Sequence, residues 1–116
     1  KHSNIMSVNK VILLGNVGKD PEIRYIEGHP LASFSLATSE RAYTNSEGIT
    51  IPERTEWHNI IMWNQAAETA EKFIRKGTRL YVEGKMRTRS WEDRNAIRHT
   101  ITEVVVDNYE ILGRTS

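Results

Sequence analysis

The sequence predicts an all-β fold, a small barrel of five strands with one helix between the third and fourth strands. Five short segments have the alternating or continuous apolar pattern that is typical of strands. A single segment, between the third and fourth of them, has its apolar residues at helical spacing. The chain has 116 residues, which is enough for one domain with one modest core.

Composition further restricts the class of protein to which the chain can belong. The chain has no cysteine, so we expect no disulfide framework, no thiolate metal site and a reducing location. We expect no membrane span, because no apolar run approaches the ~20 residues that one requires. No secretory apolar segment precedes the predicted strands. Residues 1–5 fit neither strand nor helix and Met6 is a candidate start, so we interpret residues 1–5 as a vector remnant or a disordered segment.

The first two strands come early in the chain. Residues 8–14 are apolar with one interrupting lysine, which predicts a strand buried on both sides. Two glycines and a proline in residues 15–21 predict a loop after it. Residues 31–38 are the second strand. The side chains expected on its core face are Ala32, Phe34 and Leu36.

A long polar excursion leads to the third strand. Residues 39–54 contain Asn45 and Gly48, which belong to a strong turn signal. Residues 55–63 form the third strand, and its two faces alternate. One face carries Trp57, Asn59, Ile61 and Trp63, and the other carries Glu56, His58, Ile60 and Met62. One face must pack inside the barrel, and alternation alone leaves both choices open.

The helix follows directly. Asn64 is a candidate N-cap, and Gly77 is expected at the C′ position. Basic residues near the C-terminal end favour the helix electrostatically. The apolar stripe consists of Ala66, Ala67, Ala70, Phe73 and Ile74.

The last two strands are residues 80–91 and 97–106, and residues 92–96 are a hairpin candidate. Asn95 is the residue there that tolerates a left-handed backbone. Three strands, one helix and two strands are the order of the five-stranded OB barrel, whose strands 2–3 and loops form the usual ligand surface.

The domain boundaries follow from this order. We place a single OB-fold domain at residues 6–113 and expect residues 114–116 to be a frayed end.

The most informative segment is residues 85–91, where cations and an indole alternate with smaller side chains. Residues two apart on a strand share a face. The exposed face is expected to carry Lys85, Arg87, Arg89 and Trp91. The opposite face, which suits a core, carries Leu80, Val82, Gly84, Met86, Thr88 and Ser90. Cations beside an indole suit a polyanion whose units carry flat rings, which means single-stranded nucleic acid.

Charge is concentrated around the same segment. Residues 72–98 hold nine basic and three acidic residues, a local charge of +6 in a chain whose total is +1. A charged run alone is usually a solvated face. The interleaving with aromatic residues favours an anion-binding surface instead.

Three more aromatic residues are stacking candidates. Trp57 is interpreted as a base platform, because Thr55 and Asn59 make its face partly polar. Trp63 either stacks on a base or covers the start of the helix. Tyr43, in the polar excursion, is either a solvated loop tyrosine or a platform. The candidate phosphate-binding cations are Arg87, Arg89, Lys85, Lys76, Arg75, Arg41, Arg54 and Lys10.

Catalytic and metal signals are weak. The glycines of residues 15–18 lack the spacing of a phosphate-binding loop. The four histidines are scattered without metal-ligand spacing, so no metal and no cofactor is expected. His58 and Glu56 share a strand face and are a conceivable acid–base pair, but a structural histidine is the favoured interpretation.

The chain resembles the bacterial single-stranded DNA-binding protein family. Residues 8–25 are similar to the opening of its members. Further matches follow in order at residues 36–40, 55–58, 74–77, 81–84 and 87–91. The resemblance runs to about residue 112 and implies an OB fold, sequence-independent binding of single-stranded DNA, and roles in replication, repair and recombination. It also implies a homotetramer, or a dimer as in some relatives.

The resemblance carries over to particular residues. The family's base-stacking positions fall on Trp57, Trp91 and Trp63, and a fourth falls near Ala42 and Tyr43, of which we choose Tyr43. Its basic positions match Lys10, Lys76, Arg87 and Arg89. Asn59, Gln65 and Ser90 stand where relatives often carry a cation, which predicts a shallower salt dependence of binding.

The resemblance also implies partners and a location. Members normally continue into a flexible tail with an acidic tip that recruits replication and repair proteins. We expect such partners only if this chain has a tail beyond Ser116. The implied location is the bacterial cytoplasm, with the nucleoid. The strand at residues 8–14 is expected to help pair subunits.

The sequence hypothesis is a non-enzymatic protein that coats and protects single-stranded DNA. Two alternatives from other classes remain. One is an OB-fold adaptor that binds mainly protein, of the replication-restart type. The other is an OB-fold nuclease that uses His58 and Glu56.

Overall fold

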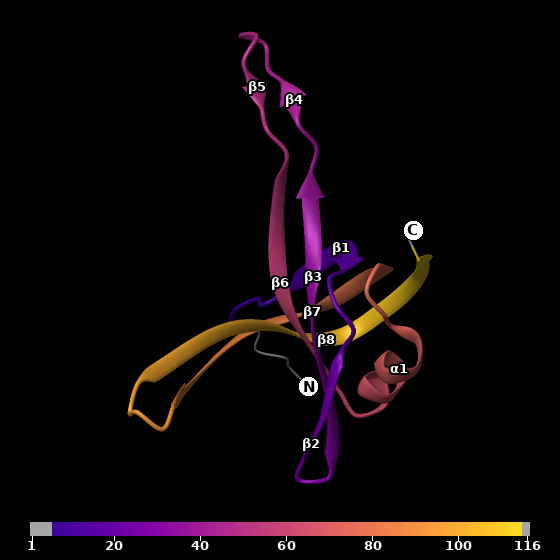
Figure 1. Cartoon of the computed structure of the whole chain (residues 1–116), viewed down its shortest axis with the longest axis vertical. Coiled ribbons are helices and arrows are strands. Elements are labelled where there is room, and N and C mark those ends of the chain that lie inside the picture. Colours follow the sequence, from indigo (N-terminus) through magenta and orange to yellow (C-terminus); the bar gives the residue numbers. More distant parts are fainter. Residues whose placement is uncertain (1–5, 115–116) are drawn as a thin grey trace.

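The structure is a computed structural model of the chain, and it describes residues 6–114. Its elements follow in the order β1 (Val11–Val17), β2 (Glu22–Ile26), β3 (His29–Glu40), β4 (Tyr43–Thr44), β5 (Thr50–Ile51), β6 (Arg54–Trp63), α1 (Gln65–Phe73), β7 (Thr78–Glu92) and β8 (Arg98–Arg114). The long strands curve around one another, and α1 packs against β3 and β6 (Figure 1).

Five strands close into a ring in the order β1, β3, β6, β8, β7. The ring closes because β1 pairs with β7 over most of its length and with β3 through Asn16 and Val17. β6 and β8 run parallel where Ile60 lies beside Val104, and the other pairings are antiparallel. β2 is an added strand on β3. The five-stranded OB barrel with one helix between its third and fourth strands is confirmed.

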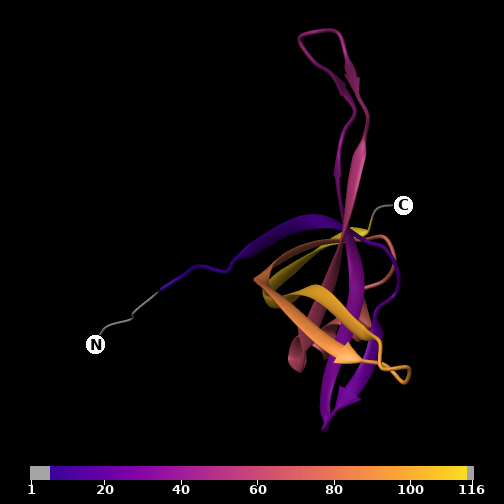
Figure 2. The ribbon, with the colours of Figure 1, turned by 90° about the vertical axis from the view of Figure 1, so that its left-hand side faces the viewer.

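Two hairpins project from this ring. Residues 41–53, called here the β4–β5 arm, extend the β3–β6 hairpin and rise away from the barrel in both views (Figure 1, Figure 2). Residues 86–103, called here the β7–β8 arm, are the outer part of the β7–β8 hairpin, beyond Val104 and Val105, which pair with β6 in the ring. The ladder shifts between Glu83 and Gly84, where Asp107 is the extra residue on β8. Such a bulge bends the strand, and the arm leaves the barrel there.

The core lies inside the ring, on the inward face of each strand and under α1. Its buried members are Val17, Ala32, Phe34, Leu36, Ile60, Met62, Ala67, Ala70, Ile74, Leu80, Val82 and Val104. The expected core face of β3 is therefore correct. On β6, Ile60 and Met62 are fully buried. The structure thus shows that the face of β6 with Ile60 and Met62 lies in the core, which alternation alone left open.

The first strand differs from its prediction. Ile12 and Leu14 are exposed, so β1 is not buried on both sides. A barrel strand has one inward face, and here it carries Val11 and Leu13. The strand also runs through the predicted loop to Val17, because Gly15 lies against the Ala37 carbonyl of β3, where a Cβ would overlap it. Glycine here marks a close backbone approach rather than a loop.

The helix ends differ too. Asn64 has a φ of 57° and makes no side-chain capping bond, and its Oδ1 lies 3.0 Å from His29 Nδ1. Phe73 is exposed rather than part of the buried stripe, because the helix ends there and the next residue is extended. Gly77 is not the C′ residue. Its positive φ serves the turn into β7, and its N–H donates to the Val17 carbonyl.

Two predictions about the last hairpin are wrong. Met86, Thr88 and Ser90 are exposed, because the arm has left the core beyond Gly84. The left-handed residue of the turn is Ala96, at φ 62°, and not Asn95. The Asp93 carboxylate causes this shift by accepting the N–H groups of Asn95 and Ile97.

The C-terminal boundary also moves. β8 extends to Arg114, which pairs with Thr78, so the last strand continues past its predicted end at residue 106 and includes Arg114, which was expected in a frayed end. The predictions for residues 1–5 and for residues 115–116 lie outside the described residues. In residues 6–114 no helix has the length and apolarity to cross a bilayer.

Candidate nucleic-acid interface

Two adjoining grooves lie between β2, β3 and β6 on one side and the β7–β8 arm on the other. Their volumes are about 450 Å³ and about 570 Å³. Arg24, Ile61, Arg89 and Glu103 line both, so the two form one continuous surface, called here the groove. Its length and open form suit a chain-like ligand better than a compact one.

The alternation of β3 and β6 forms the floor of the groove. Because Ile60 and Met62 face the core, the intervening side chains of β6 turn outward. Asn59 and Ile61 line the first groove beside Ser33 and Ser35 of β3. This floor offers hydroxyl and amide groups next to an apolar patch, which is suited to both the edges and the faces of bases.

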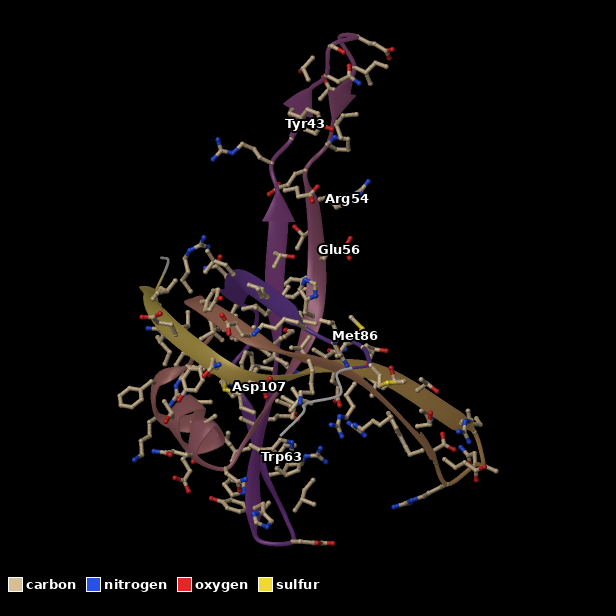
Figure 3. All side chains as sticks on the ribbon, turned by 180° about the vertical axis from the view of Figure 1, so that it is seen from behind. Tyr43, Arg54, Glu56, Trp63, Met86 and Asp107 are labelled. Atoms are coloured by element: carbon tan, nitrogen blue, oxygen red, sulfur yellow. The ribbon has the colours of Figure 1, made fainter. Side chains whose placement is uncertain are left out.

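The second groove has an apolar floor and basic walls. Ile26, Leu31, Ile61 and Val105 form the apolar part. Trp63 lies on its wall at the end of β6 (Figure 3), together with Arg87 and Arg89. Trp63 therefore belongs to the groove, and of its two predicted roles the structure favours contact with a ligand. A nucleotide in this groove could stack its base on the indole of Trp63 and place its phosphate near the guanidinium groups of Arg87 and Arg89.

Arg89 is held in place by a bidentate ion pair. Its Nε and Nη2 lie 3.0 Å and 3.1 Å from the two carboxylate oxygens of Glu103, whose side chain is almost fully buried. The bonds to Glu103 raise the pKa of Arg89 above its already high ordinary value. The guanidinium carbon of Arg89 also lies 4.9 Å from the centroid of the Trp91 ring. Arg89 is thus a fixed cation that links the groove to Trp91.

Trp91 has a second ring partner on the neighbouring strand. His99 is its direct cross-strand partner, and the two rings stack with centroids 5.4 Å apart. His99 Nε2 lies 2.7 Å from Asp93 Oδ2. Bonds from His99, and from the Ile97 and Asn95 backbones, lower the pKa of the Asp93 carboxyl. Trp91 is 42% exposed, so part of its surface stays open to a ligand.

Trp57 lies at the other end of the surface. Its six-membered ring covers Gly18, where a Cβ would overlap it, and the same Cβ would lie 2.9 Å from Ser35 Oγ. Ser35 and Lys19, which follows Gly18, both line the first groove. The ring is 61% exposed. The absence of a side chain at Gly18 therefore places an accessible indole beside the groove.

The β4–β5 arm holds Tyr43, while Arg41 and Arg54 stand near its base. Tyr43 (Figure 3) is 59% exposed, and its side chain makes no hydrogen bond or ring contact within residues 6–114. None of the three lines the two grooves. The structure brings Trp63, Arg87 and Arg89 together, with Lys85 on the same strand face, and leaves the residues of this arm apart from them.

Three other predicted cations lie outside the groove, and each makes a hydrogen bond or ion pair elsewhere. Lys10 Nζ lies 3.4 Å from Glu83 on the β1–β7 face. Arg75 donates from Nη1 to the Glu71 and Ile74 carbonyls at the C-terminal end of α1. The Lys76 backbone N–H donates to Asp20. None of these cations is among the lining residues of the groove.

The sequence interpretation missed Arg24, Lys19 and Glu103. Arg24 lines both grooves, because it alternates with Ile23, which packs on the core. The short alternation around it was a usable signal for Arg24. Nothing in the linear pattern marks Glu103 as the partner of Arg89, because their pairing depends on the register of β7 and β8.

These features define an OB-type barrel with an aromatic and basic groove. The chain belongs to the single-strand binding protein family, whose model matches residues 8–112. The sequence resemblance is thereby confirmed. A single-stranded DNA-binding protein of Bacteroides thetaiotaomicron is 55% identical over 109 residues, which cover 93% of this chain and 68% of that protein.

A solved structure is also similar. It is described as the Plasmodium falciparum SSB complex with ssDNA, and it matches with a TM-score of 0.79 and 33% identity. The match covers 95% of this chain and 99% of that one. The similarity extends over the barrel that positions the groove.

Proposed function

We propose that this chain binds and protects single-stranded DNA without reading its base sequence, in replication, repair and recombination. The observation that carries the proposal is the groove itself, where Trp63, Arg87 and Arg89 surround an apolar floor. Membership in the single-strand binding family supports it, as does the similarity to a structure described as an SSB complex with ssDNA.

Base stacking supplies the sequence-independent part of the affinity. Trp57, Trp63 and Trp91 are exposed along the groove and beside it, and Tyr43 is exposed on the β4–β5 arm. In single-strand-binding proteins of this kind, stacking on an aromatic side chain is worth about 1–3 kcal/mol per base. Every base has a flat face, so such contacts tolerate any sequence.

Phosphate contacts supply the salt-dependent part. Four cations line the groove: Lys19, Arg24, Arg87 and Arg89. Lys85 is on the same strand face as Arg87 and extends the basic surface. Arg41, Arg54, Lys76, Arg75 and Lys10 are secondary contributors, the last two with part of their donor capacity already used. Because few cations line the groove and Glu103 offsets one of them, aromatic contact carries more of the affinity than charge does.

The chain self-associates, as a homotetramer with the dimer as the alternative. Ile12 and Leu14 are exposed on the outer face of β1. Beyond Asn16 and Val17, β1 has no register with β3, so its first half presents a strand edge within the described residues. Apolar side chains next to an open edge are suited to a second copy. Sedimentation of the purified chain tests the stoichiometry.

The chain acts as a binding protein and not as an enzyme, in the bacterial cytoplasm with the nucleoid. His58, the residue of the nuclease alternative, has its Nε2 2.9 Å from Thr38 Oγ1 and is half-buried. The described residues contain no group of three acidic or histidine side chains placed to hold a metal ion. Replication and repair proteins are partners only if the protein has a tail beyond Ser116.

A fluorescence titration with oligo-dT at two salt concentrations tests the proposal. We expect strong tryptophan quenching that weakens as salt rises. Unchanged fluorescence at low salt would contradict the proposal and favour the protein-binding adaptor. Metal-dependent loss of labelled strands, abolished by His58→Ala, would favour the nuclease.

A further inference from the structure

The indole of Trp91 is the end of a continuous chain of side-chain contacts. The chain starts at Glu103, passes through Arg89 to the Trp91 ring, and continues through His99 to Asp93. Asp93 is itself fixed by two backbone N–H groups of the hairpin turn. The ring is therefore held from the barrel side and from the turn side.

Within residues 6–114, no other exposed aromatic side chain has both a stacked ring and a cation against it. Trp91, at 42%, is less exposed than Trp57 at 61%, because planar groups of Arg89 and His99 cover part of it. A residue anchored this way loses little side-chain entropy when a base stacks on it. His99 is the member of the chain that touches the indole and carries a titratable proton.

We propose that His99 is a positioning residue for Trp91, and that the Asp93–His99 pair makes single-stranded DNA binding by the β7–β8 arm stronger as pH falls. The proposal rests on the proposed function above. The imidazole keeps the indole oriented in either charge state. When protonated, it strengthens the Asp93 pair and adds a cation beside the stacking surface, where a phosphate would pass.

The charged groups around His99 favour this behaviour. Asp93 faces it from the turn, and Arg89 contacts the same Trp91 ring. Arg89 is already neutralised by its bidentate ion pair with Glu103. Glu92 and Arg98 are opposite each other one position along the strands and alternate to the other face of the arm. The protonated imidazole thus gains an anion partner with little opposing charge.

Position-specific NMR of the free chain supplies the first test. The indole N–H resonance of Trp91 is followed across about pH 5 to 8, the range in which histidines titrate. We expect it to move with pH in the unmodified chain and to stay fixed in His99→Phe, which keeps a ring but lacks the bond to Asp93. His29→Ala, which removes an exposed histidine bonded to Asn64, is the matched control and keeps the movement. A resonance insensitive to pH in the unmodified chain overturns the proposal.

Binding of oligo-dT at pH 5.5 and 7.5 supplies the second test. We expect the unmodified chain to bind about two- to fivefold more tightly at pH 5.5, and His99→Phe to lose this difference while retaining affinity at pH 7.5. His99→Ala should weaken binding at both pH values. If all variants bind like the unmodified chain, the positioning role is wrong and the proposed function stands. If the unmodified chain does not bind, the proposed function fails, while the NMR result still tests the geometry.

Discussion

The β7–β8 arm and the β4–β5 arm both project from the barrel and both carry an aromatic residue proposed to stack on bases. The β7–β8 arm is built on strands of 15 and 17 residues. Cross-strand side-chain contacts reinforce it, as between Thr88 and Thr102 and between Ser90 and Thr100. The β4–β5 arm has strands of two residues, and its described side-chain support is Oδ1 of Asn45, which accepts the Glu47 and Ile49 N–H groups.

The two arms differ in the stage at which their aromatic side chain becomes ordered. Trp91 is ordered by Arg89 and His99 before any ligand arrives. Tyr43 has no such partner in the described chain, so its side chain must be ordered on binding, which offsets part of the stacking energy. Two aromatics of similar chemical capacity should therefore contribute unequally to affinity.

The largest expected effect is on stability, from a substitution at Gly84, where the β7–β8 arm joins the barrel. In Gly84→Ala the new Cβ would overlap the Val105 carbonyl, so the two strands must separate. We expect a loss of about 1–3 kcal/mol in the free energy of unfolding, measured by urea denaturation. Lys85→Ala, at the exposed neighbouring position, is the control and should stay within about 0.5 kcal/mol. Equal stability of the two variants would show that the strands are not close-packed there.

Removing the anchored aromatic should affect binding almost as strongly. Trp91→Ala should weaken binding of oligo-dT by about 1–3 kcal/mol, roughly 5- to 150-fold in Kd. Oligo-dA and oligo-dC should lose a similar factor, because stacking tolerates any base. Titration of all three oligonucleotides makes the comparison, and a large loss for one base alone would contradict sequence-tolerant stacking.

The unanchored aromatic should matter less. Tyr43→Ala is expected to weaken binding by less than about 1 kcal/mol, since ordering of the β4–β5 arm offsets the stacking gain. The same titration, with Tyr43→Phe as control, measures it. A loss as large as that of Trp91→Ala would mean that prior anchoring does not decide the contribution of a platform.

The smallest expected effect is acid sensitivity at the tip of the β7–β8 arm. The bond from His99 lowers the pKa of Asp93 below its ordinary 3.8. Its contribution to stability is therefore present above that value and is lost as pH falls further, through the lowered pKa. The protection factors of the turn amides, which are exchange rates corrected for the pH dependence of free amides, should fall below about pH 4 in the unmodified chain. Asp93→Asn should show little further fall in these protection factors, and Glu92→Gln should behave like the unmodified chain.

Local patterns predicted most of the core and part of the groove. Ala32, Phe34 and Leu36 were placed correctly, because alternation on a strand follows from backbone geometry. The same alternation put Arg87, Arg89 and Trp91 together. The prediction failed for Met86 and Phe73, which have the hydrophobicity of core residues but lie where the arm and the helix leave the core.

Pairings between distant segments could not be predicted. Arg89 and Glu103 are 14 residues apart, and their ion pair depends on the register of β7 and β8. Gly15 was wrongly placed in a loop, because its close approach to the Ala37 backbone depends on β3. Gly18 does lie in the predicted loop, but its contact with the Trp57 ring depends on β6.

The sequence by itself determined the order of the main strands and the helix, the inward face of β3 and the joint presence of cations and an indole on one strand face. Those features depend on neighbouring residues and on the two-residue period of a strand. Only the tertiary structure decided which face of β6 lies in the core, which cations line the groove, and that the Trp91 ring contacts both Arg89 and His99. The physical reason is that these properties depend on barrel closure and strand register, which bring together side chains far apart in the chain.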